Sequence, residues 1–183
     1  MQEPIPGAGP GSTTQAFGPL GKMLFNVTKS TAIFGGLIFV AIVVMSIVSI
    51  VGRKLWAMPV PGDVEMLQMA AAFASASFFA YCHLNGGDVK VDFFTAKASP
   101  VTVHRLDALG SLLVGAFGAL ITWRAGVGAL AIRSAGETSM ILDWPVWIAQ
   151  ALMLPGFLLL ALAGFYMAGV HLRLSAQQGR GAA

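Results

Sequence analysis

The sequence predicts an all-α membrane protein with four transmembrane helices. Of its 183 residues, 56% are hydrophobic and only 10% are charged, and the mean hydropathy is +0.76. Soluble domains carry about 25% charged residues, and a soluble chain of this length could not bury so much apolar surface. The apolar residues also gather in four long stretches. Lipid is therefore the solvent that this composition fits.

The same composition excludes several classes of function. A single cysteine, Cys82, rules out an internal disulfide and any multi-cysteine metal or redox motif. The net charge of +3 is too small to indicate a nucleic acid partner. The chain has no glycine-rich phosphate loop, no metal-ligand spacing and no histidine–carboxylate pair beside its intramembrane serines. We therefore expect no enzyme activity, no catalytic or substrate-binding residue, no metal and no cofactor.

The N-terminal region is predicted to hold a disordered tail and a short helix. The first 21 residues contain four prolines and five glycines without periodicity, which predicts disorder over 1–16. From Phe17 to Val27 apolar residues recur at helical spacing, with Lys22 and Lys29 on the opposite side. This pattern predicts a helix over 17–29 at the membrane surface. The alternative is a frayed extension of the next helix.

The four apolar stretches are each long enough to cross about 30 Å of hydrocarbon as a helix. Backbone groups in lipid must be satisfied within their own segment, which makes these spans helical. The third helix begins early because Ser99 and Pro100 suit an N-cap and a first-turn proline. The segment between the second and third helices is expected to lie at the interface. The predicted transmembrane domain covers 30–172, with helices at about 31–51, 66–84, 100–133 and 144–170.

The distribution of lysine and arginine predicts the orientation. The positive-inside rule places the more basic set of loops in the cytoplasm. Both termini and the 85–105 loop then face the cytoplasm, with 173–183 as a cytoplasmic tail. The basic residues on this side are Lys22, Lys29, Lys90, Lys97, Arg105, Arg173 and Arg180, against Arg53, Lys54 and Arg133 on the other side.

Arg124 is the strongest case of an ionisable residue inside a predicted span, which makes it a functional candidate by default. It lies about 12 Å below the outer end of its helix by helical rise. We expect its guanidinium to pair with Glu65 or to hydrogen-bond Gln68 or Gln150, because an unpaired buried charge is costly. The alternative is that Arg124 extends to the outer headgroups without a partner.

The three histidines, His83, His104 and His171, fall at the cytoplasmic ends of the second, third and fourth helices. Two of them could in principle ligate haem or a metal. Haem-binding bundles, however, place facing histidines within their spans, and an amphipathic ring is stable at headgroup depth without a ligand. We therefore expect no ligation. Small residues in the second and third helices predict close packing, either internal or against another subunit.

Four motifs, taken in order, resemble the small membrane subunit (Q-type small permease) of tripartite ATP-independent periplasmic (TRAP) transporters. In that family an arginine closes the first helix, and a proline-rich outer loop leads to a glutamate. A Gly-Gly-His-hydrophobic-basic-Val-Asp signature follows the second helix, and a proline and a tryptophan open the fourth. The corresponding segments here are Gly52-Arg53, PVPGDVE at 59–65, GGDVKVD at 86–92 and TSMILDWPVW at 138–147.

The resemblance extends from about Phe34 to Leu172 and identifies candidate structural or interface residues. One position departs from the pattern, because Asp88 stands where the family usually has histidine. Ordinary structural roles are the alternative: a headgroup anchor for the arginine, a helix cap for the aspartate and a first-turn position for the proline. The matching residues are Arg53, Glu65, Gly87, Asp92, Pro145 and Trp147.

The resemblance implies a division of labour among three proteins. A periplasmic binding protein captures an organic acid, and a large membrane subunit carries it inward with sodium by an elevator movement. The small subunit extends the scaffold of the large one in the bacterial inner membrane and touches the binding protein. The alternatives are a self-sufficient proton-coupled antiporter working through Glu65, and a four-helix haem or redox protein. Glu65 begins a helix at the surface, which argues against the antiporter.

Overall fold

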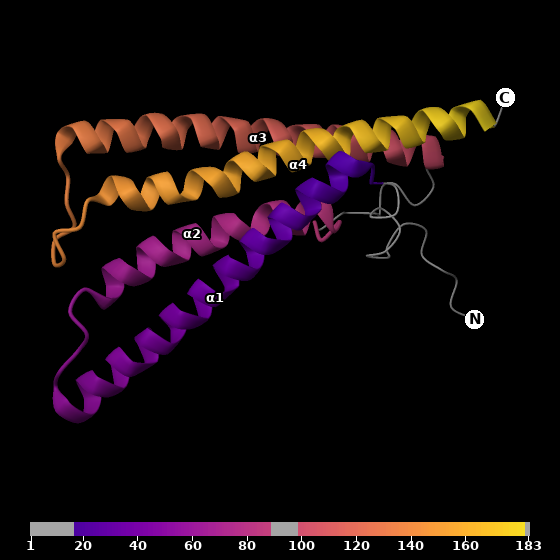
Figure 1. Cartoon of the computed structure of the whole chain (residues 1–183). Helices are drawn as coiled ribbons and strands as arrows, with labels where there is room; N and C mark the ends of the chain where they lie inside the picture. Colours follow the sequence, from indigo (N-terminus) through magenta and orange to yellow (C-terminus); the bar gives the residue numbers. More distant parts are fainter. Residues whose placement is uncertain (1–16, 89–98, 182–183) are drawn as a thin grey trace, which may run out of the picture.

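The computed structural model describes residues 17–88 and 99–181, and four helices make up most of them (Figure 1). Each helix is long and apolar enough to cross a membrane, so the predicted fold class of an all-α protein with four transmembrane helices is confirmed. The predicted tail over 1–16, most of the segment between the second and third helices, and Asp92 lie outside the described residues. The helices are α1 (Pro19–Trp56), α2 (Asp63–Leu84), α3 (Pro100–Ala135) and α4 (Val146–Gly181).

The first helix differs from the prediction. α1 runs for 38 residues without a break, so the helix expected over 17–29 is its N-terminal part, as in the alternative of a helix extension. Pro19 occupies the first turn, where a proline is tolerated, and no proline follows until after Trp56. Phe17, just before α1, is buried and packs edge-on against Tyr166 of α4 at 5.6 Å between ring centroids. This aromatic contact fixes the start of α1 on the bundle.

The helices form two pairs that diverge from one end to the other (Figure 1). α3 packs mainly on α4, while α2 lies between α4 and α1. At one end, here called the closed end, α2 ends and α3 begins, close to the start of α1. At the other, the splayed end, the α1–α2 and α3–α4 connections lie side by side. The alternating helix directions therefore place both predicted outer loops at the splayed end.

Glycines allow α3 and α4 to approach closely. A Cβ atom added to Gly164 would overlap the backbone of Gly115, and one added to Gly118 would lie 2.8 Å from the backbone nitrogen of Ala161. Lipid tails are as apolar as leucine, so membrane helices associate through close packing of this kind and not through hydrophobic burial. The small residues at the α3–α4 contact therefore serve internal packing.

We predict that Gly164→Ala destabilises the bundle by about 1–3 kcal/mol, because the added methyl group must push α3 and α4 apart. Gly169→Ala in the same helix is the matched control, since nothing lies within 4 Å of a Cβ at that position. Thermal unfolding in detergent measures both variants. Equal melting temperatures for the two would show that the α3–α4 contact is not tight.

Candidate functional site

At the splayed end, Asp63 joins the end of α1 to the start of α2. Its Oδ2 accepts a hydrogen bond from the Ser49 hydroxyl at 2.5 Å and one from Nη2 of Arg53 at 3.2 Å. Its Oδ1 accepts from the backbone N–H of Val64 at 2.9 Å. Ser49 is completely buried and also accepts from the N–H of Val60. The Asp63 carboxylate thus joins the last turns of α1 to the first turn of α2 across the loop between them.

Arg53 was a candidate from sequence, whereas its partner Asp63 was not. The arginine side chain is 59% exposed and the aspartate 18%, so the aspartate is the better fixed of the two. The sequence could have indicated Asp63 as a structural residue. It directly follows a Pro-Gly turn, and an acidic residue at this position stabilises the positive N-terminal end of a helix dipole. The contact with Ser49 could not be foreseen, since it depends on how α1 and α2 pack.

Glu65 connects the two loops of the splayed end. Its carboxylate oxygens accept hydrogen bonds from the backbone N–H groups of Ile141 at 2.9 Å and Leu142 at 3.1 Å. The Leu142 side chain lies against Gly62, where the φ of +71° and the absence of space for a Cβ both require glycine. We call Gly62, Glu65, Ile141 and Leu142 the loop clamp. The clamp holds the α1–α2 and α3–α4 connections together.

The polar layer predicted around Arg124 does not form in the described part of the chain. No hydrogen bond or ion pair there joins Arg124 to Glu65, Gln68 or Gln150. Arg124 and Gln68 are exposed, and Gln150 packs against Gly128 with its Oε1 buried and without a described partner. The reason is helical register: α3 turns its glycine face toward α4, which leaves Arg124 on the outer surface.

Pro145 and Trp147 fix the start of α4. Between α3 and α4 the chain folds into a tight hairpin, in which the Ser139 N–H donates to the carbonyl of Trp144 at 2.8 Å. Pro145 then directly precedes the first residue of α4. The Arg133 guanidinium lies 5.1 Å from the ring centroid of Trp147, a cation–π contact between α3 and α4. From the sequence, Arg133 was expected at the outer end of the third helix, and its contact with Trp147 was not foreseen.

Gly87 terminates α2 together with its neighbour Gly86. Gly86 has a φ of +65°, and its N–H donates to the carbonyl of His83. The Gly87 N–H donates to the carbonyl of Cys82 at 2.9 Å, and a Cβ on Gly87 would meet the Cys82 sulfur at the same distance. This is the usual way in which glycine ends a helix. The Gly-Gly pair therefore has a backbone role here.

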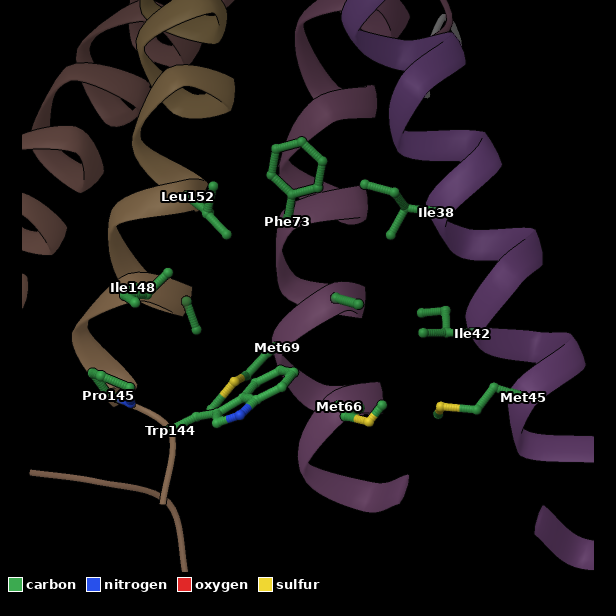
Figure 2. Close-up of a pocket in the computed structure, with 12 residues that line it drawn as sticks. Ile38, Ile42, Met45, Met66, Met69, Phe73, Trp144, Pro145, Ile148 and Leu152 are labelled. Carbon is green, nitrogen blue, oxygen red and sulfur yellow. The ribbon is translucent and has the colours of Figure 1, made fainter. Parts of the chain in front are cut away.

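An apolar groove crosses α4, α2 and α1 near the splayed end (Figure 2). Its volume is about 560 Å³. No charged side chain lines it, so a carboxylate placed there would lose its hydration without compensation. Its three methionines give it a deformable apolar wall. The lining residues include Ile38, Met45, Met69, Phe73, Trp144 and Ile148.

The three histidines meet at the closed end. Nδ1 of His83 lies 2.5 Å from Oδ2 of Asp88, which gives a partner to the aspartate that departs from the family pattern. The rings of His104 and His171 lie 5.8 Å apart. The adjoining cavity measures about 270 Å³, less than the roughly 300 Å³ at which drug-sized ligand pockets begin. A haem group is larger still, so this geometry does not favour the haem alternative.

The chain was compared with models of protein families. A family model described as "Tripartite ATP-independent periplasmic transporters, DctQ component" matches residues 34–173, or 140 of the 183 residues. No curated protein and no solved structure matches the chain. The matched range includes the α1–α2 loop, the loop clamp and the apolar groove.

We predict that Glu65→Gln loosens the loop clamp. The amide side chain offers one carbonyl oxygen in place of two carboxylate oxygens, and it carries no charge. Hydrogen exchange at the N–H groups of Ile141 and Leu142 should therefore accelerate by about tenfold or more. Glu137→Gln is the matched control, because this exposed acidic residue lies in the same connection. Unchanged exchange in Glu65→Gln would contradict the clamp.

We also predict that Asp63→Ala lowers the melting temperature clearly more than Arg53→Gln does. The aspartate variant loses three hydrogen bonds and leaves the buried Ser49 hydroxyl without its acceptor. The arginine variant loses one exposed pair, and such pairs contribute little. Thermal unfolding of both variants at low and high salt measures the two decreases in melting temperature. An equal or larger decrease for Arg53→Gln would refute the prediction.

Proposed function

The chain belongs to the DctQ component family of TRAP transporters, and from this membership we propose that it is the scaffold subunit of a TRAP transporter that imports an organic acid with sodium. The family is a transporter-component family, and the four apolar helices make the chain a multi-pass membrane protein. Membership implies association with a large permease and a binding protein. In our proposal, the large subunit moves the substrate and this chain supports it.

The arrangement of polar contacts supports a rigid scaffold. Among the described residues, the side-chain hydrogen bonds and ion pairs that join one helix to another helix or to another connection lie at the two ends of the bundle. In the middle, the hydroxyls of Ser46, Ser77 and Thr122 bond to carbonyls of their own helices. All four helices are also continuous, whereas transporter binding sites form at interrupted helices. This bundle therefore offers no polar path for an anion.

We infer that the large subunit docks on the apolar groove. α1 is covered mainly by α2, and only 17% of its most apolar stretch is buried, compared with 33% for α2. The groove lies next to this exposed helix and can accept apolar side chains from a partner helix. The large subunit that the family implies is itself a membrane protein, so we place its contact with the groove within the bilayer. Lipid is the other possible occupant.

The splayed end is the proposed contact for the periplasmic binding protein. The loop clamp and the Asp63 contacts hold the two connections as one unit. Met140 is 98% exposed and Met58 75%, and exposed apolar residues of this kind often mark contact surfaces. The distribution of basic residues supports placing this end in the periplasm and both termini in the cytoplasm. We place the whole complex in the bacterial inner membrane.

The antiporter alternative is not favoured by the geometry of Glu65. A proton-coupled carboxylate needs to exchange its proton with substrate or ion near the middle of the membrane. Glu65 instead lies in the first turn of α2, and both of its oxygens hold backbone N–H groups of the opposite loop. The Glu65 carboxylate therefore has a structural role, which is to join the two loops of the splayed end.

Co-purification tests the proposal. A tagged wild-type chain, extracted in mild detergent from its own host, should recover a large polytopic membrane protein. Ala149→Trp, which places an indole in the groove, should reduce that recovery by about tenfold, a loss of about 1.4 kcal/mol. Ala119→Trp, on the exposed face of α3, is the matched control and should leave recovery unchanged.

Two outcomes would contradict the proposal at different levels. A wild-type chain that recovers no large membrane protein would contradict the scaffold function itself. Full recovery with Ala149→Trp would contradict the docking surface alone. If recovery is full and native mass spectrometry shows that Ala149→Trp has lost a bound phospholipid, lipid and not the large subunit occupies the groove.

A further inference from the structure

Three potential metal ligands meet at the closed end of the bundle. His104 and Asp107 come from α3 and His171 from α4, and each offers one ligand atom within 4.8 Å of the others. Nδ1 of His171 lies 4.0 Å from Oδ2 of Asp107. This cluster lies apart from the loop clamp and the groove, which are near the splayed end.

The sequence and the helix packing account for this convergence. His104 and Asp107 are three residues apart, so they share one face of α3. The side chain of Ser99 caps the start of α3 by accepting from the N–H of Thr102, which fixes the first turns of the helix. The glycine contact between α3 and α4 then holds His171 opposite that face. All three side chains therefore project from packed helices, as a preorganised site requires.

We propose that His104, Asp107 and His171 bind a divalent transition metal ion of the Zn²⁺ type. Two imidazole nitrogens and one carboxylate oxygen form a common ligand set for zinc sites with an open position. Ligands 2.0–2.2 Å from a tetrahedral ion lie about 3.3–3.5 Å apart. The separations here are at most 4.8 Å, so they exceed this by no more than about 1.5 Å, a gap that histidine and aspartate close by rotation about their broad χ2 torsions.

Two of the three ligands, Asp107 and His171, also line an adjoining cavity. His171 and Asp107 line one side of the 270 Å³ space, and His83 and Asp88 line it from the end of α2. This volume is large enough for the water that would fill the remaining coordination position of an ion bound by the three ligands. Asp88 brings a second carboxylate into the same cavity, which lowers the cost of holding a doubly charged ion there. His171 is only 4% exposed, while the Asp107 side chain at 22% leaves a way in.

Bound metal would link α3 to α4 at the closed end, as the loop clamp links the helix pairs at the splayed end. A ligand that binds only the folded state stabilises it in proportion to the logarithm of its concentration. The proposal concerns this chain alone and does not depend on its place in a transporter.

The test is a Zn²⁺ titration of the full chain, purified with a tag free of histidine, stripped with a chelator and placed in nanodiscs. Calorimetry should show one ion per chain with a Kd in the micromolar range or below, and Zn²⁺ should raise the melting temperature. His104→Gln and His171→Gln should each weaken binding by at least about tenfold, because even outer-shell partners of a metal site contribute that much. Arg105→Gln, an exposed neighbour, is the matched control and should bind as wild type does.

Asp107→Asn keeps the test decisive if His171→Gln unfolds the chain, because it preserves side-chain shape. In the presence of chelator, the Asp107→Asn variant should have the melting temperature of the wild type. With Zn²⁺ added, its melting temperature should rise much less than that of the wild type. Either of two results would overturn the proposal. One is the absence of saturable Zn²⁺ binding by the wild type. The other is unchanged affinity in His104→Gln and Asp107→Asn.

Discussion

Close backbone contact between α3 and α4 is the interaction on which the rest of the bundle depends. Gly115, Gly118 and Gly164 bring the two backbones together, and in lipid such packing replaces the hydrophobic effect that would hold helices together in water. The same contact sets the rotation of α3. It turns Arg124 to the outside and places His104 and Asp107 next to α4.

Polar groups act where the close packing ends. In the first turn of α2, Asp63 fixes the α1–α2 loop and Glu65 fixes the α3–α4 connection. Two acidic side chains at a helix N-terminus also complement the helix dipole. The helix pairs can therefore diverge toward the splayed end without separating. That divergence leaves the apolar groove between α4, α2 and α1, the surface on which a membrane partner can bind (Figure 2).

The sequence predicted the helices better than the contacts between them. Ser99 and Pro100 located the start of α3 correctly, because an N-cap and a first-turn proline are local signals. The segment 17–29 was expected as a separate surface helix or as an extension of the next helix, and most of it is the N-terminal part of the continuous α1, because no proline or glycine turn interrupts the helix there. Glu65 was selected as a candidate from the sequence, but its partners, backbone N–H groups 76 and 77 residues away, were not foreseen. Backbone donors carry no sequence signal.

The four membrane-crossing helices follow from the amino-acid sequence alone, because the length and polarity of each stretch decide its partition into lipid. The motifs along the chain also determined the family. The packing of the helices is needed to know which side chains meet: Asp63 with Ser49, Glu65 with the opposite loop, and His171 with His104 and Asp107. The physical reason is that partition into lipid depends on one segment at a time. Rotation and pairing of helices depend on surfaces that are brought together only when the whole bundle packs.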